Sequence, residues 1–187
     1  DALYYNTASD NVAVGRKAME TNTSGTYNTA LGRAALASNT TASNNTAVGY
    51  QSLYSNTTGT RATAVGYLAG YSNTTGGDLT AIGYLAARDV TTAGSSTFVG
   101  AYAGENITTG NANTVVGRTA LRTATTAINN VAIGNDTLEL ATGDSNTFVG
   151  SRAGVSMTTG SRNTVIGRFT GNQGGLDIRT SSNNIVL

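Results

Sequence analysis

Few side chains in this sequence could carry out catalysis or bind a metal. The 187-residue chain contains no His and no Cys, which excludes a thiolate nucleophile, an imidazole base and the usual zinc and haem ligand sets. Carboxylates remain, because a glycosidase needs only two of them about 5 to 9 Å apart. The ten carboxylates share no common spacing; they are Asp1, Asp10, Glu20, Asp78, Asp89, Glu105, Asp136, Glu139, Asp144 and Asp177.

A compact fold could bring two carboxylate pairs together, Asp78 with Asp89 and Glu139 with Asp144. Scattered surface charges are also expected for solubility and for blocking edge-to-edge strand pairing. The sequence contains no phosphate-binding loop, nucleophile elbow or calcium-loop motif, and Lys17 is its only lysine. We therefore predict no enzyme activity, no cofactor and no metal site.

Tyrosines are the most informative candidates for recognition. Tyr50, Tyr67 and Tyr84 recur at every seventeenth position, and Tyr54 and Tyr71 have the same spacing. If the fold stacks these positions, their rings and hydroxyls could bind a sugar, which makes them the predicted receptor or glycan surface. A structural ladder of identical side chains also explains the spacing, and both interpretations stay open. Arginine occupies the first of these columns elsewhere, at Arg16, Arg33, Arg118 and Arg168.

A column of threonines suggests a different class of function. Regular Thr ranks on a flat solenoid face are typical of several ice-binding proteins. Here the Thr residues accompany Gly in expected turns, and turn chemistry also accounts for them. Ice binding is therefore kept as an alternative. The column consists of Thr23, Thr40, Thr57, Thr74, Thr91, Thr108, Thr125, Thr142 and Thr158.

The elements that must position these residues come from an internal repeat. An aliphatic-Gly pair recurs at every seventeenth position, except that the step between Gly134 and Gly150 is one position shorter. The final segment, 183–187, looks like an eleventh copy without its Gly. Eleven copies of this unit would account for the whole chain, so we predict a single repeat domain over residues 1–187.

Each repeat predicts one coil of a parallel β-solenoid. Residues such as 45–49 form a short β-branched strand, and a segment such as 55–59 (Ser-Asn-Thr-Thr-Gly) supplies a turn. A unit of this length is too short for a helical-repeat hairpin and too rich in Thr, Asn and Gly for one helix. Coils stacked about 4.7 Å apart would give an all-β rod roughly 50 Å long.

Alternation along the strands separates two uncharged columns. Because both are apolar, we expect one to form the core and the other to be covered by further copies of the chain, three around one axis. The alternative is that the small residues fill a tight single-chain coil. The predicted core ladder is Val14, Leu31, Val48, Val65, Ile82, Val99, Val116, Ile133, Val149 and Ile166; the predicted interchain ladder is Ala13, Ala30, Ala47, Ala64, Ala81, Phe98, Val115, Ala132, Phe148 and Val165.

The charge balance argues against two kinds of partner. Eleven basic and ten acidic side chains give a net charge of +1, and only 11% of the residues are charged. Such a surface lacks the basic face that nucleic acids or anionic membranes require. No stretch approaches the ~20 apolar residues of a membrane span. We expect no nucleic-acid partner and no membrane insertion.

The strand motif carries a resemblance. Segments 10–15 (Asp-Asn-Val-Ala-Val-Gly) and 129–134 (Asn-Asn-Val-Ala-Ile-Gly) resemble the repeat of trimeric autotransporter adhesin heads, and segment 45–59 is similar to repeats of bacteriophage tail-fibre proteins. The resemblance implies a left-handed parallel β-roll in an intertwined homotrimer on a virion tail fibre or a cell surface, where it binds a glycan or protein receptor. The predicted function is thus a structural and host-recognition fibre segment, with a bacterial adhesin head as the alternative. Phe98 and Phe148 depart from the small residue of the motif.

Overall fold

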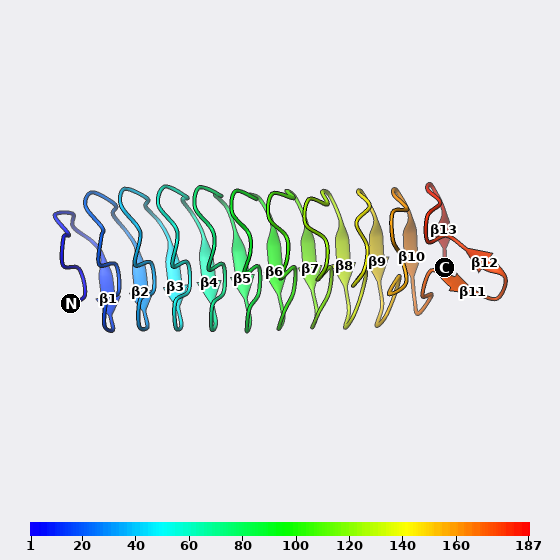
Figure 1. Cartoon of the computed structure of the whole chain (residues 1–187), viewed down its shortest axis with the longest axis horizontal. Coiled ribbons are helices and arrows are strands. Elements are labelled where there is room, and N and C mark those ends of the chain that lie inside the picture. Colours follow the sequence, from blue (N-terminus) through cyan, green and yellow to red (C-terminus); the bar gives the residue numbers. More distant parts are fainter.

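The computed structural model describes all 187 residues as a rod of stacked coils (Figure 1). Eleven short strands form one parallel sheet along the rod, in the order β1 to β10 followed by β13. No helix is present, and nothing in the chain could cross a membrane as a helix. The predicted all-β parallel solenoid is confirmed. The sheet strands are β1 (Val12–Val14), β2 (Thr29–Leu31), β3 (Thr46–Val48), β4 (Thr63–Val65), β5 (Thr80–Ile82), β6 (Thr97–Val99), β7 (Thr114–Val116), β8 (Val131–Ile133), β9 (Thr147–Val149), β10 (Thr164–Ile166) and β13 (Ile185–Val186).

Two coils differ in length without disturbing the strand register. The short step between β8 and β9 still pairs Val131 with Thr147. The last coil, which runs from Thr164 to its partner Ile185, is longer than the repeat predicts. Its additional residues form a small antiparallel hairpin of β11 (Asn172–Gln173) and β12 (Leu176–Asp177), which lies at the C-terminal end of the rod in Figure 1. Length changes are therefore absorbed outside the strands.

The structure reverses the predicted roles of the two strand columns. In each three-residue strand the central side chain points into the coil, and from Ala30 to Val165 this column is fully buried. The aliphatic column points outward; Val14 is 55% exposed and Ile166 is 46% exposed. The prediction that Val14, Leu31, Val48, Val65, Ile82, Val99, Val116, Ile133, Val149 and Ile166 form the core is therefore wrong. The buried Ala, Phe and Val column cannot contact another chain either, because the coil's own opposite wall covers it.

The interior is filled by volume exchange across the coil. Several strands place a small residue inward and face a larger one six positions later, as Ala47 does with Leu53, whereas Ala64 faces Gly70. Where the strand supplies Phe98, the facing position is Gly104, and a Cβ there would lie 2.2 Å from the phenyl ring. Phe148 and Gly154 repeat the exchange. In the Phe98 and Phe148 coils the large side chain therefore comes from the strand, and the facing wall provides the space for it.

Glycine after each strand from β1 to β9 is required by the stacking of coils within one chain. Gly49 has a φ of +131°, and a Cβ built on it would lie 2.3 Å from the carbonyl oxygen of Gly66 in the next coil. Side chains other than hydrogen do not fit this approach. The glycine column therefore serves the single chain and is not evidence of close approach between chains.

Buried asparagines form a polar ladder inside the N-terminal half of the rod. The Nδ2 atoms of Asn39, Asn56 and Asn73 each donate to the Oδ1 atom of the asparagine one coil earlier, at 2.7, 3.1 and 2.8 Å. The next coil has Val90 at this position. The ladder therefore ends there, and Asn73 Oδ1 has no partner. Elsewhere the buried amides are satisfied, as such groups must be.

Candidate functional site

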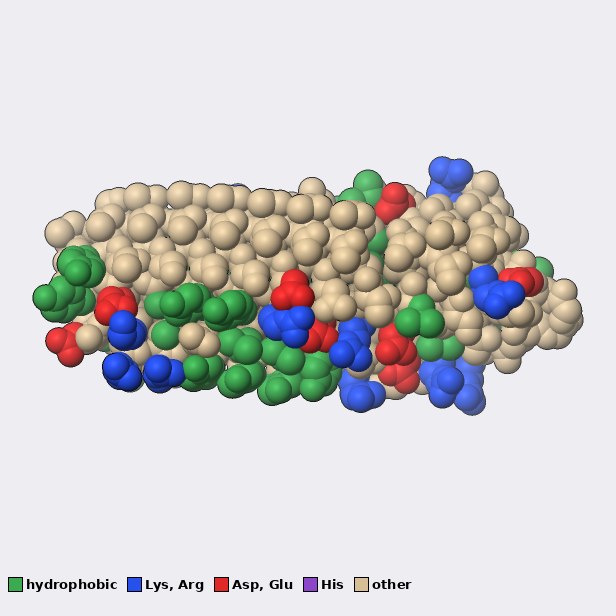
Figure 2. Space-filling view, viewed as in Figure 1, with side chains coloured by type: hydrophobic (Ala, Val, Ile, Leu, Met, Phe, Trp, Pro, Cys, Tyr) green, Lys and Arg blue, Asp and Glu red, His purple; other side chains and the backbone are tan.

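The predicted tyrosine columns form two stacked ladders on the surface. The ring centroids of Tyr50 and Tyr67 lie 5.3 Å apart with planes 10° from parallel, and Tyr67 and Tyr84 repeat this at 5.3 Å and 11°. Tyr54 and Tyr71 stack at 5.2 Å and 9°. Figure 2 shows hydrophobic side chains gathered along one edge of the rod, with Lys and Arg on either side of them and a mixed basic and acidic cluster beside their middle. Each ring covers its neighbour's face, while Tyr67 and Tyr84 remain 45% and 47% exposed.

Both ends of the longer ladder are closed. The Arg33 guanidinium lies 5.4 Å from the Tyr50 ring centroid, and its Nη1 donates to the Tyr50 hydroxyl at 2.9 Å. At the other end Tyr102 meets Tyr84 edge-on at 71°, with Arg122 lying 5.2 Å over the Tyr102 ring. A sugar that stacks on an aromatic face finds no free face here. The geometry favours the structural-ladder interpretation for the rings and leaves their polar edge as the accessible part.

Packing within the ladder also affects the ionisation of Tyr84. Desolvation between its neighbours raises the pKa of the Tyr84 phenol above its ordinary value, and Tyr102 and Tyr67 add to this. A phenol of ordinary pKa is already protonated at neutral pH, and the upward shift keeps the Tyr84 hydroxyl protonated further into the alkaline range. The Tyr102 contribution was not predicted, because Tyr102 lies one residue past the repeat position of the ladder.

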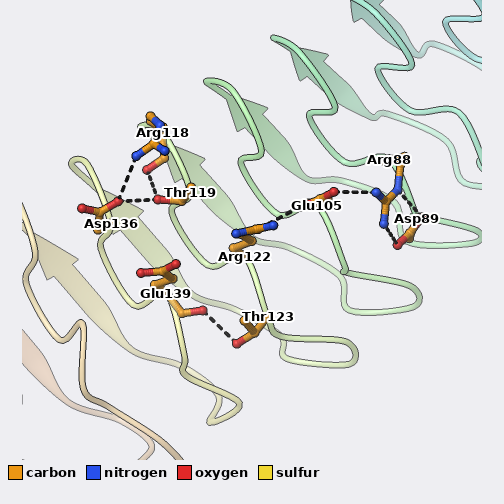
Figure 3. Close-up of polar contacts among 9 residues, drawn as sticks. All are labelled: Arg88, Asp89, Glu105, Arg118, Thr119, Arg122, Thr123, Asp136 and Glu139. Carbon is orange, nitrogen blue, oxygen red and sulfur yellow. Dashed lines mark hydrogen bonds and ion pairs between the residues drawn. The ribbon is translucent and has the colours of Figure 1, made fainter.

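Beyond Tyr54 and Tyr71, the same column continues as charged residues (Figure 3). The Glu105 carboxylate lies between Arg88 and Arg122, bonded to both, and the Arg122 Nε–Glu105 Oε2 distance is 2.8 Å. Arg88 also holds Asp89 at 2.6 Å, which chiefly raises the pKa of the Arg88 guanidinium. Alternating charge in stacked coils is attractive, whereas like charges directly opposite repel. The alternation Arg88, Glu105, Arg122 and Glu139 at the repeat spacing was visible in the sequence and could have predicted this cluster.

Replacing Glu105 with Gln tests this cluster. The Glu105 side chain is 5% exposed, and its removal leaves Arg88 and Arg122 facing each other. Because the arginines stay partly solvated, we expect the free energy of unfolding in urea to fall by about 1–3 kcal/mol. Glu139→Gln is the control, since Glu139 shares the column but forms no ion pair; equal losses in both variants would contradict the role of the cluster.

In the first candidate carboxylate pair, Asp78 and Asp89 are each held by an arginine and form no acid–base site; in the second pair, Asp144 accepts from the Ile128 N–H at 2.9 Å and no contact joins it to Glu139. Asp78 is bonded twice to Arg61, at 2.6 and 2.9 Å, and this contact holds the Asp78 pKa below its usual range. Asp89 is held by Arg88, on a different part of the coil. Asp136 accepts from Thr119 and lies 3.7 Å from Arg118. Across the chain no three acidic side chains lie close enough to bind a metal ion.

The predicted threonine column is held within the turns. The Thr23 hydroxyl donates to the Thr40 carbonyl at 2.9 Å, and Thr57 donates to Thr74 at 3.1 Å. Thr91 and Thr108 continue the pattern. These hydroxyls stabilise the stacking of coils and do not form a free array. The ice-binding interpretation therefore loses the column on which it was based.

A second threonine column lies on what we name the strand face. It is the outer surface of the sheet, made of these threonines and the exposed aliphatic column described above. The hydroxyls make no hydrogen bond within the chain, and the face carries no charge over its whole length. Sequence reasoning assigned this face to the interior. Its threonines are Thr29, Thr46, Thr63, Thr80, Thr97, Thr114, Thr147 and Thr164.

Comparison with known protein families, curated sequences and solved structures finds no match. The fold and its surfaces define a parallel β-solenoid repeat protein whose main exposed features are the strand face and the tyrosine ladders.

Proposed function

We propose that the chain is a structural and host-recognition fibre segment that assembles as a homotrimer through its strand face. The observation that carries the proposal is an uncharged Thr and aliphatic surface that runs along the whole sheet. At one coil per ~4.8 Å this strip is about 50 Å long. Exposed apolar strips larger than a few hundred Å² mark interaction sites. A parallel sheet is also normally covered on both sides.

A fibre role accounts for the rest of the molecule without catalysis. Coils template one another through backbone hydrogen bonds, and ladders of Tyr, Asn, Thr and alternating charge fix their stacking. The carboxylates are engaged by arginines or lie scattered, which supports a non-enzymatic protein. A phage tail fibre displayed on a virion is the setting that the repeat resemblance favours, and a bacterial surface adhesin head is the alternative. Attachment to a cell surface would then use the exposed ladders.

The molar mass in solution tests the trimer. Light scattering coupled to size exclusion should give about three times the 18.9 kDa chain mass. Ile82, 39% exposed in the middle of the strand face, is the position to disrupt. Ile82→Glu would place one buried charge per chain at the interface, so we expect it to elute near the mass of one chain with its β-sheet spectrum intact.

Thr75→Glu is the matched control, because Thr75 is exposed in a turn away from the strand face. It should keep the trimer mass. A single-chain mass for the unmodified protein would overturn the homotrimer, and loss of assembly in both variants would show that the strand face is not the interface.

The strand face also favours one second candidate, ice binding. Its threonine hydroxyls make no hydrogen bond within the chain and recur once per coil along one sheet, unlike the turn threonines on which the sequence interpretation depended. The two candidate functions require different exposure of the strand face, because assembly buries it and ice binding needs it exposed to solvent. A monomer that inhibits ice recrystallisation, and that loses the activity in Ile82→Glu, would support the second candidate.

A further inference from the structure

Most of the arginines without carboxylate partners lie at or beside the tyrosine column of the rod. Ion pairs engage Lys17, Arg61, Arg88, Arg118, Arg122 and Arg179, and Arg162 donates to Asn183. The four that remain are Arg16, Arg33, Arg152 and Arg168, of which Arg33 donates to the Tyr50 hydroxyl. Arg16, Arg33 and Arg168 share the repeat position of Tyr50, and Arg152 is one residue past it. Unpaired positive charge therefore borders the ladder at its Tyr50 end, as Arg16 and Arg33, whereas Arg152 and Arg168 lie several coils beyond Tyr84.

Arg16 and Arg33 are the closest such pair. They occupy the same position in successive coils, whose strands pair Val12 with Thr29 in register, so their attachment points lie about one strand spacing, ~4.8 Å, apart. Like charges directly opposite each other repel. The bond to the Tyr50 hydroxyl holds Arg33 against the ladder, which limits its freedom to move away from Arg16. An anion bound between them would relieve the repulsion.

Next to these two arginines, the tyrosine hydroxyls form a row along the rod. Tyr50, Tyr67 and Tyr84 present their edges at the coil spacing, with Tyr67 45% and Tyr84 47% exposed. A phenol hydroxyl both donates and accepts hydrogen bonds. An extended ligand lying along this edge would thus meet guanidinium groups first and then a line of hydroxyls, without needing an open ring face.

We propose that this edge, defined by Arg16, Arg33, Tyr50, Tyr67 and Tyr84, binds an acidic polysaccharide. Guanidinium groups recognise carboxylate and sulfate oxygens through charge-assisted hydrogen bonds, and the hydroxyl row suits the neutral hydroxyls of the same polymer. This assignment rests on the proposed host-recognition function and names the class of receptor for it. It differs from stacking of a neutral sugar, which the closed ladder does not accommodate.

Binding of the full chain to immobilised polymers tests the proposal. Polygalacturonate provides carboxylates, heparin provides sulfates, dextran is neutral, and duplex DNA is a polyanion of another class. We expect binding to one or both acidic polysaccharides, weakened when ionic strength rises from about 0.1 to about 1 M. The stronger of the two identifies the anionic group. Equal binding to dextran, equal binding to DNA or no binding to either acidic polymer would overturn the assignment.

Two double variants distinguish the effect of losing the edge arginines from the effect of lowering the net charge. Arg16→Gln/Arg33→Gln should weaken binding to the acidic polymer at least about tenfold. Arg61→Gln/Arg162→Gln removes the same two charges elsewhere and should change binding less than about twofold. Equal losses in both would overturn the edge as the site. Molar mass, measured on the same samples, reports assembly separately, so a failure of the homotrimer remains distinguishable from a failure of polysaccharide binding.

Discussion

Gly49→Ala is expected to lower the free energy of unfolding by about 4 kcal/mol or more, among the largest effects of any single substitution. Two costs combine at this position. The φ of +131° is unfavourable for any residue with a Cβ, and that Cβ would lie 2.3 Å from the Gly66 carbonyl oxygen. Relief requires the two coils to separate, which breaks the sheet in the middle of the rod. Urea unfolding and limited proteolysis of the purified variant provide the measurement.

Gly167→Ala separates the two costs. Gly167 holds the same repeat position with a φ of +112°, but no atom lies within 4 Å of the Cβ it would gain. This variant should lose only the backbone contribution, about 1–2 kcal/mol. If Gly49→Ala and Gly167→Ala were equally destabilised, coil stacking would not be what requires glycine in this column.

Phe98→Ala should destabilise the solenoid by about 3–5 kcal/mol, because it empties the interior where the facing position has no side chain. The structure also specifies the repair. Adding Gly104→Leu would recreate the Ala47 and Leu53 arrangement, and Leu53 already adopts a φ of +48°, close to the +57° of Gly104. The double variant is therefore expected to regain most of the lost stability in urea unfolding.

Gly104→Leu alone is the second single variant needed for a double-mutant cycle with Phe98→Ala. Its Cβ would lie 2.2 Å from the Phe98 ring, so we expect a loss of several kcal/mol through overpacking. Losses that simply add in the double variant would contradict volume exchange across the coil, since coupled neighbours deviate from additivity.

Much of the architecture could be predicted from the sequence, because the same strand and turn pattern recurs in every coil. The repeat period located every strand of the parallel sheet, and the tyrosine spacing correctly placed Tyr50, Tyr67 and Tyr84 in one column. Alternation shows that a strand has two faces, but it does not say which face points inward. Size then misled the assignment, because the larger aliphatic side chains were expected inside.

A different signal in the sequence could have resolved the two faces. Phe98 precedes Gly104 by six positions, and Phe148 precedes Gly154 by the same interval. Such compensation between a large and a minimal residue occurs only where both share one enclosed volume. The β11–β12 hairpin also had a signal, Gly174-Gly175 between short polar segments, which is typical of a two-residue hairpin turn. It was missed because the last coil was assumed to have the standard length.

The closed ends of the tyrosine ladder could not be predicted. Whether Arg33 lies over Tyr50 and Tyr102 meets Tyr84 edge-on depends on side-chain conformations, which repeat spacing does not encode. Which arginines lack a carboxylate partner could not be predicted either, because this is known only once every ion pair in the fold has been identified.

The strand register is preserved through coils of three different lengths, which makes the length of this rod adjustable in whole steps of about 4.8 Å. A gene encoding such a rod could be shortened or lengthened by one coil without realigning the others. The permitted edits are not the same everywhere, however. Excising residues 90–106 would place Arg88 directly against Arg122, whereas excising one coil between Tyr50 and Tyr84 would leave tyrosine on tyrosine. The order of side chains along each column therefore determines which coils can become neighbours.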